Sequence, residues 1–239
     1  MKFAVDLHIH TALSPCGDND MTPNNIVNMA LLKGLDLIAV TDHNSCANVE
    51  AVMDAGRNKG LMVIPGIEVQ SKEEVHLICL FKKIEQALEF GELIYSSLSD
   101  IPNNEELFGS QLIMDAMDNI TGKLKKLLLT SSTYSVNEIF ELSNKFGGMC
   151  IPAHVDRPGY SIISNLGFIP PNIKVDAVEI SKNSKLEAVI EKMPFIKCYN
   201  HIISSDAHYL WDISEREYFI EMEYISASRL FEALQASTK

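Results

Sequence analysis

The sequence predicts an α/β fold built on a mostly parallel β-sheet. Short apolar runs rich in β-branched residues alternate with segments whose apolar residues recur at helical spacing. The length of 239 residues suits one sizeable domain and permits a full barrel. No internal repeat, low-complexity segment or linker interrupts this pattern, so we expect a single domain over residues 1–239.

The ends of the expected elements are marked by residues that cap or stop them. Thr22 and Pro23 give the first helix an N-cap followed by proline at the first helical position. Gly34 and Gly60 end the first two helices. The expected strands are residues 3–10, 35–41, 61–68, 75–81, 149–153, 175–180, 201–205 and 218–223. The expected helices are residues 24–33, 47–59, 85–98, 135–146, 184–193 and 226–236.

Residues 82–135 break the regular alternation of strands and helices. Beyond the helix at 85–98, this stretch holds the turn-rich run 101–104, and Gly122 could turn a hairpin. We interpret 82–135 as an insertion within the barrel domain that forms a lid beside the barrel mouth, where specificity often resides. A surface excursion without function is the alternative, and the sequence favours neither.

The composition excludes some classes of protein. The net charge of −12 argues against a broad basic surface for nucleic acid, which makes nucleic acid an unlikely partner, but it does not exclude a small anion held at metal ions. Five scattered cysteines, an odd number, indicate reduced thiols and not a disulfide framework. No segment is long and apolar enough to span a membrane, and the N-terminus lacks a secretory pattern, so a cytoplasmic location is expected. The oligomeric state cannot be predicted.

Histidines and acids gather at the ends of the expected strands. His8 and His10 are two residues apart, so in a strand both imidazoles leave the same face. Two partly buried core histidines are the alternative for this pair alone. Six of the seven histidines, however, recur near the end of an apolar run, often beside an acid. A shared polynuclear metal site explains that recurrence better than unrelated structural needs do. The further members of the set are His43, Glu68, His76, His154, Asp206 and His208.

Five short motifs follow one another in order along most of the chain. They are Asp6-Leu7-His8-Ile9-His10-Thr11, Thr41-Asp42-His43, Gly66-Ile67-Glu68-Val69, Ala153-His154 and Ser205-Asp206-Ala207-His208. Together they resemble the polymerase and histidinol phosphatase (PHP) family of metal-dependent phosphoesterases, and specifically its small stand-alone members. The resemblance implies a distorted seven-stranded (β/α) barrel with a trinuclear site of up to three metal ions at the carboxyl ends of the strands.

The resemblance also implies how the ligands divide among the ions. One ion would be held by His8, His10, Glu68 and Asp206. Glu68 would bridge to a second ion held by His76 and His154. A third would be held by His43, His208 and a ligand from the loop after the first strand.

The sequence departs from the family pattern in that loop. It reads Ser14-Pro15-Cys16-Gly17-Asp18-Asn19-Asp20. Counting back from Thr22-Pro23 favours Asp18, whereas counting forward from His10 lands nearer Cys16, and Asp20 also stays open. We predict Asp18 as the ninth metal ligand. Asp42, beside His43, is expected to orient a ligand and not to bind the ion itself.

The expected function is hydrolysis of a small phosphorylated metabolite or nucleotide by attack of a metal-bound hydroxide. Glu68 would set the spacing of the ions, Asp206 would combine a ligand role with proton transfer, and Arg157 would bind phosphate oxygens through its guanidinium fork. A surface ion pair is the alternative for Arg157. The mixed ligands suit Mn, Zn or Fe without selecting among them. The rival functions are a metal-binding regulatory module without turnover and a nuclease acting on nucleic-acid ends.

Overall fold

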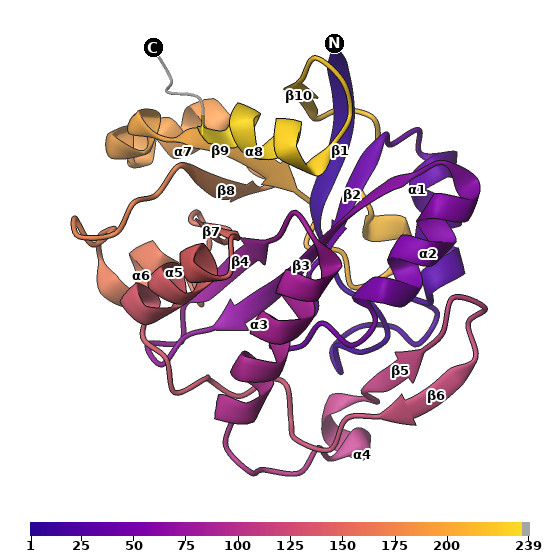
Figure 1. The fold of residues 1–239 in the computed structure, drawn as a ribbon. Coiled ribbons are helices and arrows are strands. Elements are labelled where there is room, and N and C mark those ends of the chain that lie inside the picture. The colour runs from indigo at the N-terminus through magenta and orange to yellow at the C-terminus, as the bar shows by residue number, and fades with distance from the viewer. Residues whose placement is uncertain (236–239) are drawn as a thin grey trace.

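The computed structural model describes residues 1–235, and at its centre a six-stranded mixed sheet curls into half a barrel with helices on its outer side (Figure 1). The strand order is β10-β1-β2-β3-β4-β7, and two separate two-stranded sheets are β5-β6 and β8-β9. The strands are β1 Lys2–Ile9, β2 Leu37–Val40, β3 Met62–Gln70, β4 His76–Leu80, β5 Leu112–Met114, β6 Ile120–Lys123, β7 Met149–Pro152, β8 Ala177–Ser181, β9 Asn200–Ser204 and β10 Phe219–Glu221.

The sheet is less parallel than the sequence predicts. β1, β2 and β3 run parallel, but β4 is antiparallel to both of its neighbours, β3 and β7. The reason is the connection: only residues 71–75 join β3 to β4, which is too short for the crossover that a parallel pair needs. Because of this reversal, the first residue of β4, His76, pairs with Gln70 at the end of β3. A strand that runs backwards thus presents its start at the edge where its neighbours end.

The strands around the site do not form one continuous hydrogen-bonded barrel in the part of the chain that the structure describes. The β8-β9 pair is parallel and forms its own sheet. It is tied to β7 through Val155 N, which donates to Glu179 O at 2.9 Å. It is tied to β1 through a parallel bridge between Ile9 and Ala207. These ties place β8 and β9 between β7 and β1, and the closed seven-stranded barrel stays a prediction.

Helices α1 and α5 begin within one residue of the expected position, and both have a formed N-cap. The Thr22 side chain accepts from Asn25 N, and Ser135 closes a capping box with Glu138. At the other end of a helix, Gly60 takes the left-handed conformation that ends α2. The last expected helix, 226–236, is observed as α8, and residue 236 lies outside the described residues. The helices are α1 Pro23–Leu32, α2 Val49–Lys59, α3 Ile84–Ser97, α4 Glu105–Phe108, α5 Val136–Lys145, α6 Ile162–Leu166, α7 Leu186–Lys192, α8 Ala227–Gln235 and the 3₁₀ turns η1 Pro194–Cys198 and η2 Leu210–Asp212.

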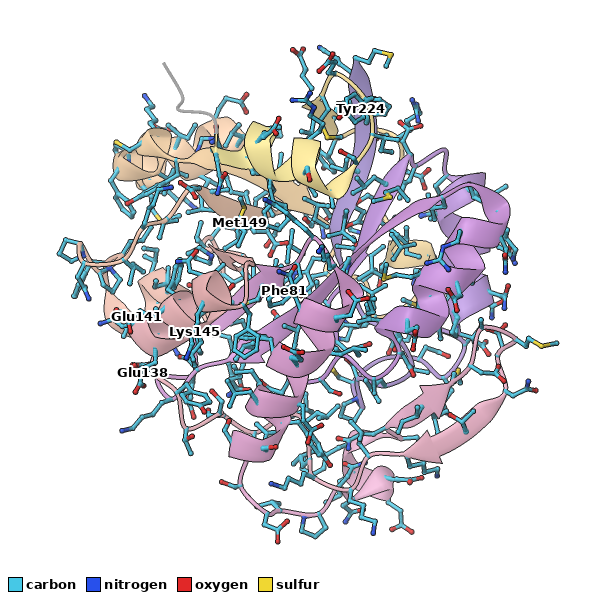
Figure 2. The ribbon with its side chains drawn as sticks, viewed as in Figure 1. Phe81, Glu138, Glu141, Lys145, Met149 and Tyr224 are labelled. Carbon is cyan, nitrogen blue, oxygen red and sulfur yellow. The ribbon has the colours of Figure 1, made fainter. Side chains whose placement is uncertain are left out.

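Two apolar clusters fix where the polar site can lie. One packs the outer face of the sheet against the helices, where Phe81 meets Phe90 of α3 with ring centroids 5.1 Å apart (Figure 2). The other fills the inside of the curl at the amino ends of the strands, where Leu37, Met149 and Phe231 of α8 pack together. Since this end is plugged by apolar side chains, the polar residues at the carboxyl ends face the open end.

The segment 82–135 combines core and peripheral parts. Its helix α3 packs against β3, with Ala87, Phe90 and Ile94 buried. The remainder forms α4 and the β5-β6 hairpin. The sequence suggested that Gly122 turns a hairpin, and this is wrong. Gly122 pairs with Ile113 inside the ladder, and the turn lies at residues 115–119. The limits of the insertion and its role as a lid stay predictions. Within residues 1–235, no helix combines the length and apolar character needed to cross a bilayer.

Candidate metal centre

Eight of the nine predicted metal ligands converge at the open end of the curled sheet. They come from strands and loops far apart in the sequence. Seven of them form three overlapping groups, and within each group the ligand atoms all lie within 4.8 Å of one another. The eighth, His154, lies 3.3 Å from the carboxylate of Glu68, which belongs to two of these groups. The converging residues are His8, His10, His43, Glu68, His76, His154, Asp206 and His208. His201, the remaining histidine, bonds to Ile196 O instead, at 2.9 Å.

A bulge in β1 aims the first two histidines at this site. The pairing of β1 with β2 shifts register between Asp6 and Ile9. A bulge adds a residue to one strand and re-aims the side chains that follow it. Leu7 packs into the inner apolar cluster, and the fully buried His8 and His10 point at the polar centre. The strand therefore passes from core packing to ligand presentation within one residue.

Glu68, on the inner face of β3, lies at the middle of the cluster and is almost fully buried. Its Oε1 is 3.0 Å from His76 Nδ1, and its Oε2 is 2.9 Å from His43 Nδ1. Further ring nitrogens between 3.3 and 3.5 Å from its carboxylate belong to His8, His10 and His154. Burial tends to raise the pKa of Glu68, but His76, His8 and His43 outweigh it and hold the pKa well below its usual value. Glu68 is therefore a carboxylate whose two oxygens face different groups of imidazoles.

Asp206 supplies a second carboxylate on the opposite side of His8 and His10. Its Oδ1 is 3.2 Å from His8 Nε2 and 3.0 Å from His10 Nε2. The two Nε2 atoms lie only 3.1 Å apart. Burial raises the pKa of Asp206, but the imidazoles, His8 foremost, bring it well below its ordinary value. Two ring nitrogens and two carboxylates thus face one point.

The hydrogen bonds behind these histidines show which ring nitrogen is free to bind an ion. Both oxygens of Glu179 lie 3.1 Å from His8 Nδ1, and since a carboxylate only accepts, Nδ1 carries the hydrogen. His10 Nδ1 lies 2.9 Å from Ser14 Oγ, whose own hydrogen goes to Asp42 Oδ1 at 2.7 Å. His10 Nδ1 must therefore donate. In each neutral ring the lone pair is then on Nε2, the atom that points to the centre.

The residues present fit a group of cations. Among residues 1–235, Glu68 Oε2 is buried and makes no hydrogen bond of acceptable geometry, despite the nearby His43. His154 Nδ1 is likewise buried without a partner. Buried polar atoms without partners are rare and costly, whereas imidazole and carboxylate are the usual ligands of Zn, Mn and Fe. The three groups that could each hold an ion are His8-His10-Glu68-Asp206, His43-Glu68-His76 and His10-His43-His208.

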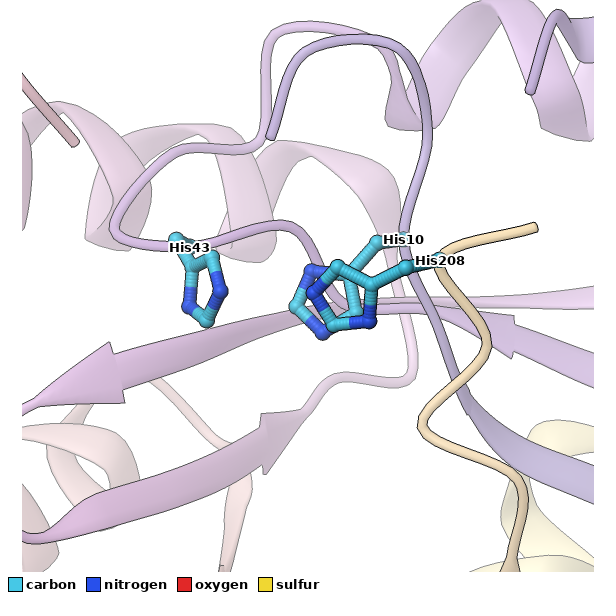
Figure 3. A group of neighbouring side chains, drawn as sticks. All are labelled: His10, His43 and His208. Carbon is cyan, nitrogen blue, oxygen red and sulfur yellow. The ribbon is translucent and has the colours of Figure 1, made fainter. Parts of the chain in front are cut away.

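The third group is shown in Figure 3, where the rings of His10 and His208 overlap and His43 faces them across the site. The ring centroid of His10 is 4.1 Å from that of His208 and 4.4 Å from that of His43. The loop after β1 wraps this group, because Asp18 N donates to His208 O at 2.9 Å. This loop is where the sequence predicts one more ligand.

The structure does not bring Asp18 to this group. Its Oδ1 accepts a hydrogen bond from Asp20 N at 2.8 Å, and it belongs to none of the three ion-binding groups. Cys16, the alternative, belongs to none of the three groups either. Burial raises the pKa of its thiol, but the nearby imidazoles of His208 and His43 bring that pKa down to about 6. The choice between Asp18 and Cys16 stays open, and Asp18 stays a prediction.

Two of the converging residues have strained backbones. His154 has φ of 31° and Asp206 has φ of 53°, a region that non-glycine residues enter rarely. His154 is held by its own amide, which donates to Glu179 Oε2 at 2.9 Å. Strain of this kind concentrates at functional sites because the surroundings must enforce it.

Arg157 reaches the centre, and its role in substrate binding stays a prediction. Its Nη1 donates to Asp206 Oδ2 at 2.5 Å and its Nε to Ser181 Oγ at 3.2 Å. It does not pair with Asp156, which bonds to Ser181 and Ser184 instead. The guanidinium is therefore a cation beside a candidate ligand and is not paired away at the surface.

Glu179 and Ser14 are the site residues that sequence reasoning missed. Glu179 is an acid within an apolar strand, and this position was the signal in the sequence. An acid in a buried strand needs partners, and Glu179 is almost fully buried. Ser14 lies in a loop with no marker of its own. Asp42 takes the orienting position expected of it, accepting from Ser14 and from Thr11 N at 2.7 Å.

The family model of the PHP domain matches residues 6–191. The chain belongs to the PHP family. A relative from Eggerthella lenta, named phosphoribosyl 1,2-cyclic phosphate 1,2-diphosphodiesterase, is 30% identical to this PHP chain over 80 residues, which are 31% of the chain and 29% of the relative. Across the curated relatives that it matches, the PHP chain spans between 18% and 44% of their length.

Solved structures share the PHP fold over nearly the whole chain. A lesion-specific endonuclease, PfuEndoQ from Pyrococcus furiosus, has a TM-score of 0.70 and 18% identity over 98% of this chain and 56% of its own. A putative metal-dependent phosphoesterase from Bifidobacterium adolescentis has a TM-score of 0.61 and 17% identity over 98% of this chain and 96% of its own. These likenesses show the fold.

Nothing in these comparisons supports the expectation that nucleic acid is an unlikely partner of this PHP protein, and the likeness to an endonuclease shows the fold alone. The expectation rested on the net charge of the whole chain, −12. That charge is a poor guide here, because a phosphate at this site would meet Arg157 and the ions of the cluster and would not need a broad basic surface.

Proposed function

We propose that this chain is a metal-dependent phosphoric ester hydrolase that acts on a small phosphorylated metabolite or nucleotide. The observation that carries the proposal is the convergence of six histidines on two buried carboxylates, with Arg157 bonded to one of them. Two to three divalent ions, Mn, Zn or Fe, would be held by the eight converging residues, with Cys16 or Asp18 completing the third position.

When bound, such ions neutralise the charge of the ester and lower the pKa of a water ligand toward neutrality. The remaining work falls to the chain itself. Glu68 belongs to two of the three ion-binding groups, so it would set the distance between the ions held there. Glu179 and Ser14 hold the tautomers of His8 and His10. The imidazoles hold the pKa of Asp206 well below its ordinary value, so it would serve first as a charged ligand, and in any proton transfer it would accept the proton before it could return it.

Arg157 is placed to bind the phosphate of the substrate. Its guanidinium is partly exposed and is held by two hydrogen bonds, from Nη1 to Asp206 Oδ2 and from Nε to Ser181 Oγ. The planar fork matches two phosphate oxygens. A site with a cation cluster on one side and a guanidinium on the other suits a doubly charged phosphoryl group better than a neutral amide or lactone carbonyl.

The test is turnover by protein reconstituted with Mn²⁺, Zn²⁺ or Fe²⁺, measured with p-nitrophenyl phosphate and with a panel of phosphomonoesters, cyclic phosphates and a labelled oligonucleotide. Wild type should hydrolyse at least one class. Glu68→Gln should not, and Glu141→Gln, an exposed change on α5, should behave as wild type. Full metal occupancy without turnover of any substrate would favour the regulatory module. Turnover of the oligonucleotide alone would favour the nuclease.

A further inference from the structure

Tyr160 forms part of the wall of the candidate metal centre without belonging to the ligand set. Its ring is stacked on the imidazole of His76, with centroids 4.8 Å apart and an angle of 24° between the planes. His76 Nδ1 in turn lies 3.0 Å from Glu68 Oε1. Tyr160 remains 52% exposed. One part of the ring thus covers a candidate ligand while the rest is open to solvent.

The backbone of Tyr160 is strained, and the ring of Tyr160 adds no core packing that would offset the cost of this strain. Its φ is 58°, in the left-handed region that glycine or asparagine would enter more easily. Hydrogen bonds hold the loop in place: His76 N donates to Tyr160 O at 2.8 Å, and Ser161 Oγ donates to Arg157 O at 2.9 Å. The ring is not buried in either apolar cluster. Strain that is enforced at a site and gives no core packing points to a use for the side chain.

The same loop carries both Tyr160 and Arg157, three residues apart. Arg157 N donates to His154 O at 2.9 Å, so the loop is anchored directly on a candidate ligand. One short segment therefore offers a guanidinium for phosphate and, beside it, a flat apolar surface. A ligand that uses both has a phosphoryl group and a planar ring within one molecule, and a nucleotide has this chemistry.

We propose that Tyr160 determines specificity by stacking against the base of a nucleotide, free or at the end of a strand, whose phosphate lies between the metal cluster and Arg157. This inference rests on the proposed function and goes beyond it by naming the group that the substrate must carry. Stacking of a base on an aromatic side chain changes affinity by about 5- to 150-fold, equivalent to about 1–3 kcal/mol at about 1.4 kcal/mol per tenfold. The sugar and the phosphate do not contribute to this difference.

The experiment measures binding of adenosine 5′-monophosphate and ribose 5-phosphate to metal-loaded protein by calorimetry. The two probes share sugar and phosphate and differ by the base. Wild type should prefer the nucleotide. Tyr160→Leu should reduce that preference by about 5- to 150-fold, and Tyr160→Phe should keep it because the ring is retained. Tyr224→Leu is the matched control, since Tyr224 is 51% exposed and lies at the far end of the molecule beside β10 (Figure 2).

Three results would overturn the inference. The first is a wild type with no preference for the nucleotide. The second is a preference that survives in Tyr160→Leu. The third is an equal loss of affinity for both probes together with weaker metal binding, which would mean that Tyr160 only holds His76 in position. Because the readout is binding, failure of the metal-loaded protein to hydrolyse any substrate of the panel would refute the proposed function separately.

Discussion

Replacing Glu179 with glutamine tests whether the residues behind the ligands control the metal centre. Glu179 holds two donors at once, His8 Nδ1 at 3.1 Å and the amide of His154 at 2.9 Å. Glutamine has nearly the same shape but only one accepting oxygen, and its NH₂ group must face one of the two donors. A glutamine oxygen in the place of Oε2 can still reach both donors, but the NH₂ group then takes the place of Oε1 and faces His8 Nδ1. The change therefore removes the charge from both hydrogen bonds and sets a donor against His8 Nδ1, which weakens the hold on its tautomer.

The expected magnitude follows from that lost charge. A hydrogen bond to a charged group contributes about 1.5–3 kcal/mol, and about 1.4 kcal/mol corresponds to a tenfold change in affinity. We therefore expect Glu179→Gln to bind its tightest ion about 10- to 100-fold more weakly, in the range found for residues that orient metal ligands. Turnover at saturating metal should fall less than metal affinity, because every direct ligand is still present.

The assay is competition for Zn²⁺ against a chelator of known affinity, followed by turnover with excess metal. Glu141→Gln removes the same charge from the exposed face of α5 and should bind zinc as wild type does (Figure 2). A folded Glu179→Gln variant with wild-type zinc affinity would refute the argument that Glu179 fixes His8.

Further expected outcomes concern the ligands and the substrate side of the site. Glu68→Gln should cut both metal content and turnover severely, because a neutral amide bridges two cations poorly. Elemental analysis measures the metal content, and wild-type activity in this variant would mean that another residue bridges the ions. Arg157→Ala should raise KM for a phosphomonoester by about 10- to 100-fold at unchanged metal content, since a charge-assisted contact of about 1.5–3 kcal/mol is lost, and Arg157→Lys should recover part of it; equal KM values would make Arg157 dispensable for the phosphate. In a metal-free Cys198→Ser background, alkylation of Cys16 by iodoacetamide should rise as the pH passes about 6, because the thiolate forms above that pKa. Bound metal should slow this alkylation if Cys16 is a ligand, and unchanged rates would leave the loop position to Asp18.

Local patterns predicted much of the fold and of the ligand set, because each pattern has its own physical signal. The spacing of His8 and His10 indicated a shared strand face, and Thr22-Pro23 marked a helix start. The direction of β4 was readable only from the length of the loop before it, and the sequence pattern alone suggested a more parallel sheet.

Other features depended on contacts between distant segments. Glu179 looks like any acid in an apolar strand until the fold brings it to His8, which is 171 positions away. Gly122 could equally turn a hairpin or lie inside one, and the turn went to residues 115–119, where Asp118 takes positive φ. Counting along the loop could not decide between Asp18 and Cys16, because the choice depends on how that loop folds around His208.

The division of the strands into separate hydrogen-bonded sheets means that a bound ion would also connect these sheets. His8 lies in β1, His10 directly follows β1, and Glu68 lies in β3, whereas Asp206 follows β9 of the separate pair. An ion held by these four residues would add a cross-link between two sheets that are joined here by an isolated backbone bridge, Ile9 to Ala207, and not by a continuous ladder. Loading the site should therefore slow amide exchange in β8 and β9 more than in β2 and β3. The ion that supports catalysis would then also stabilise the strands that surround it.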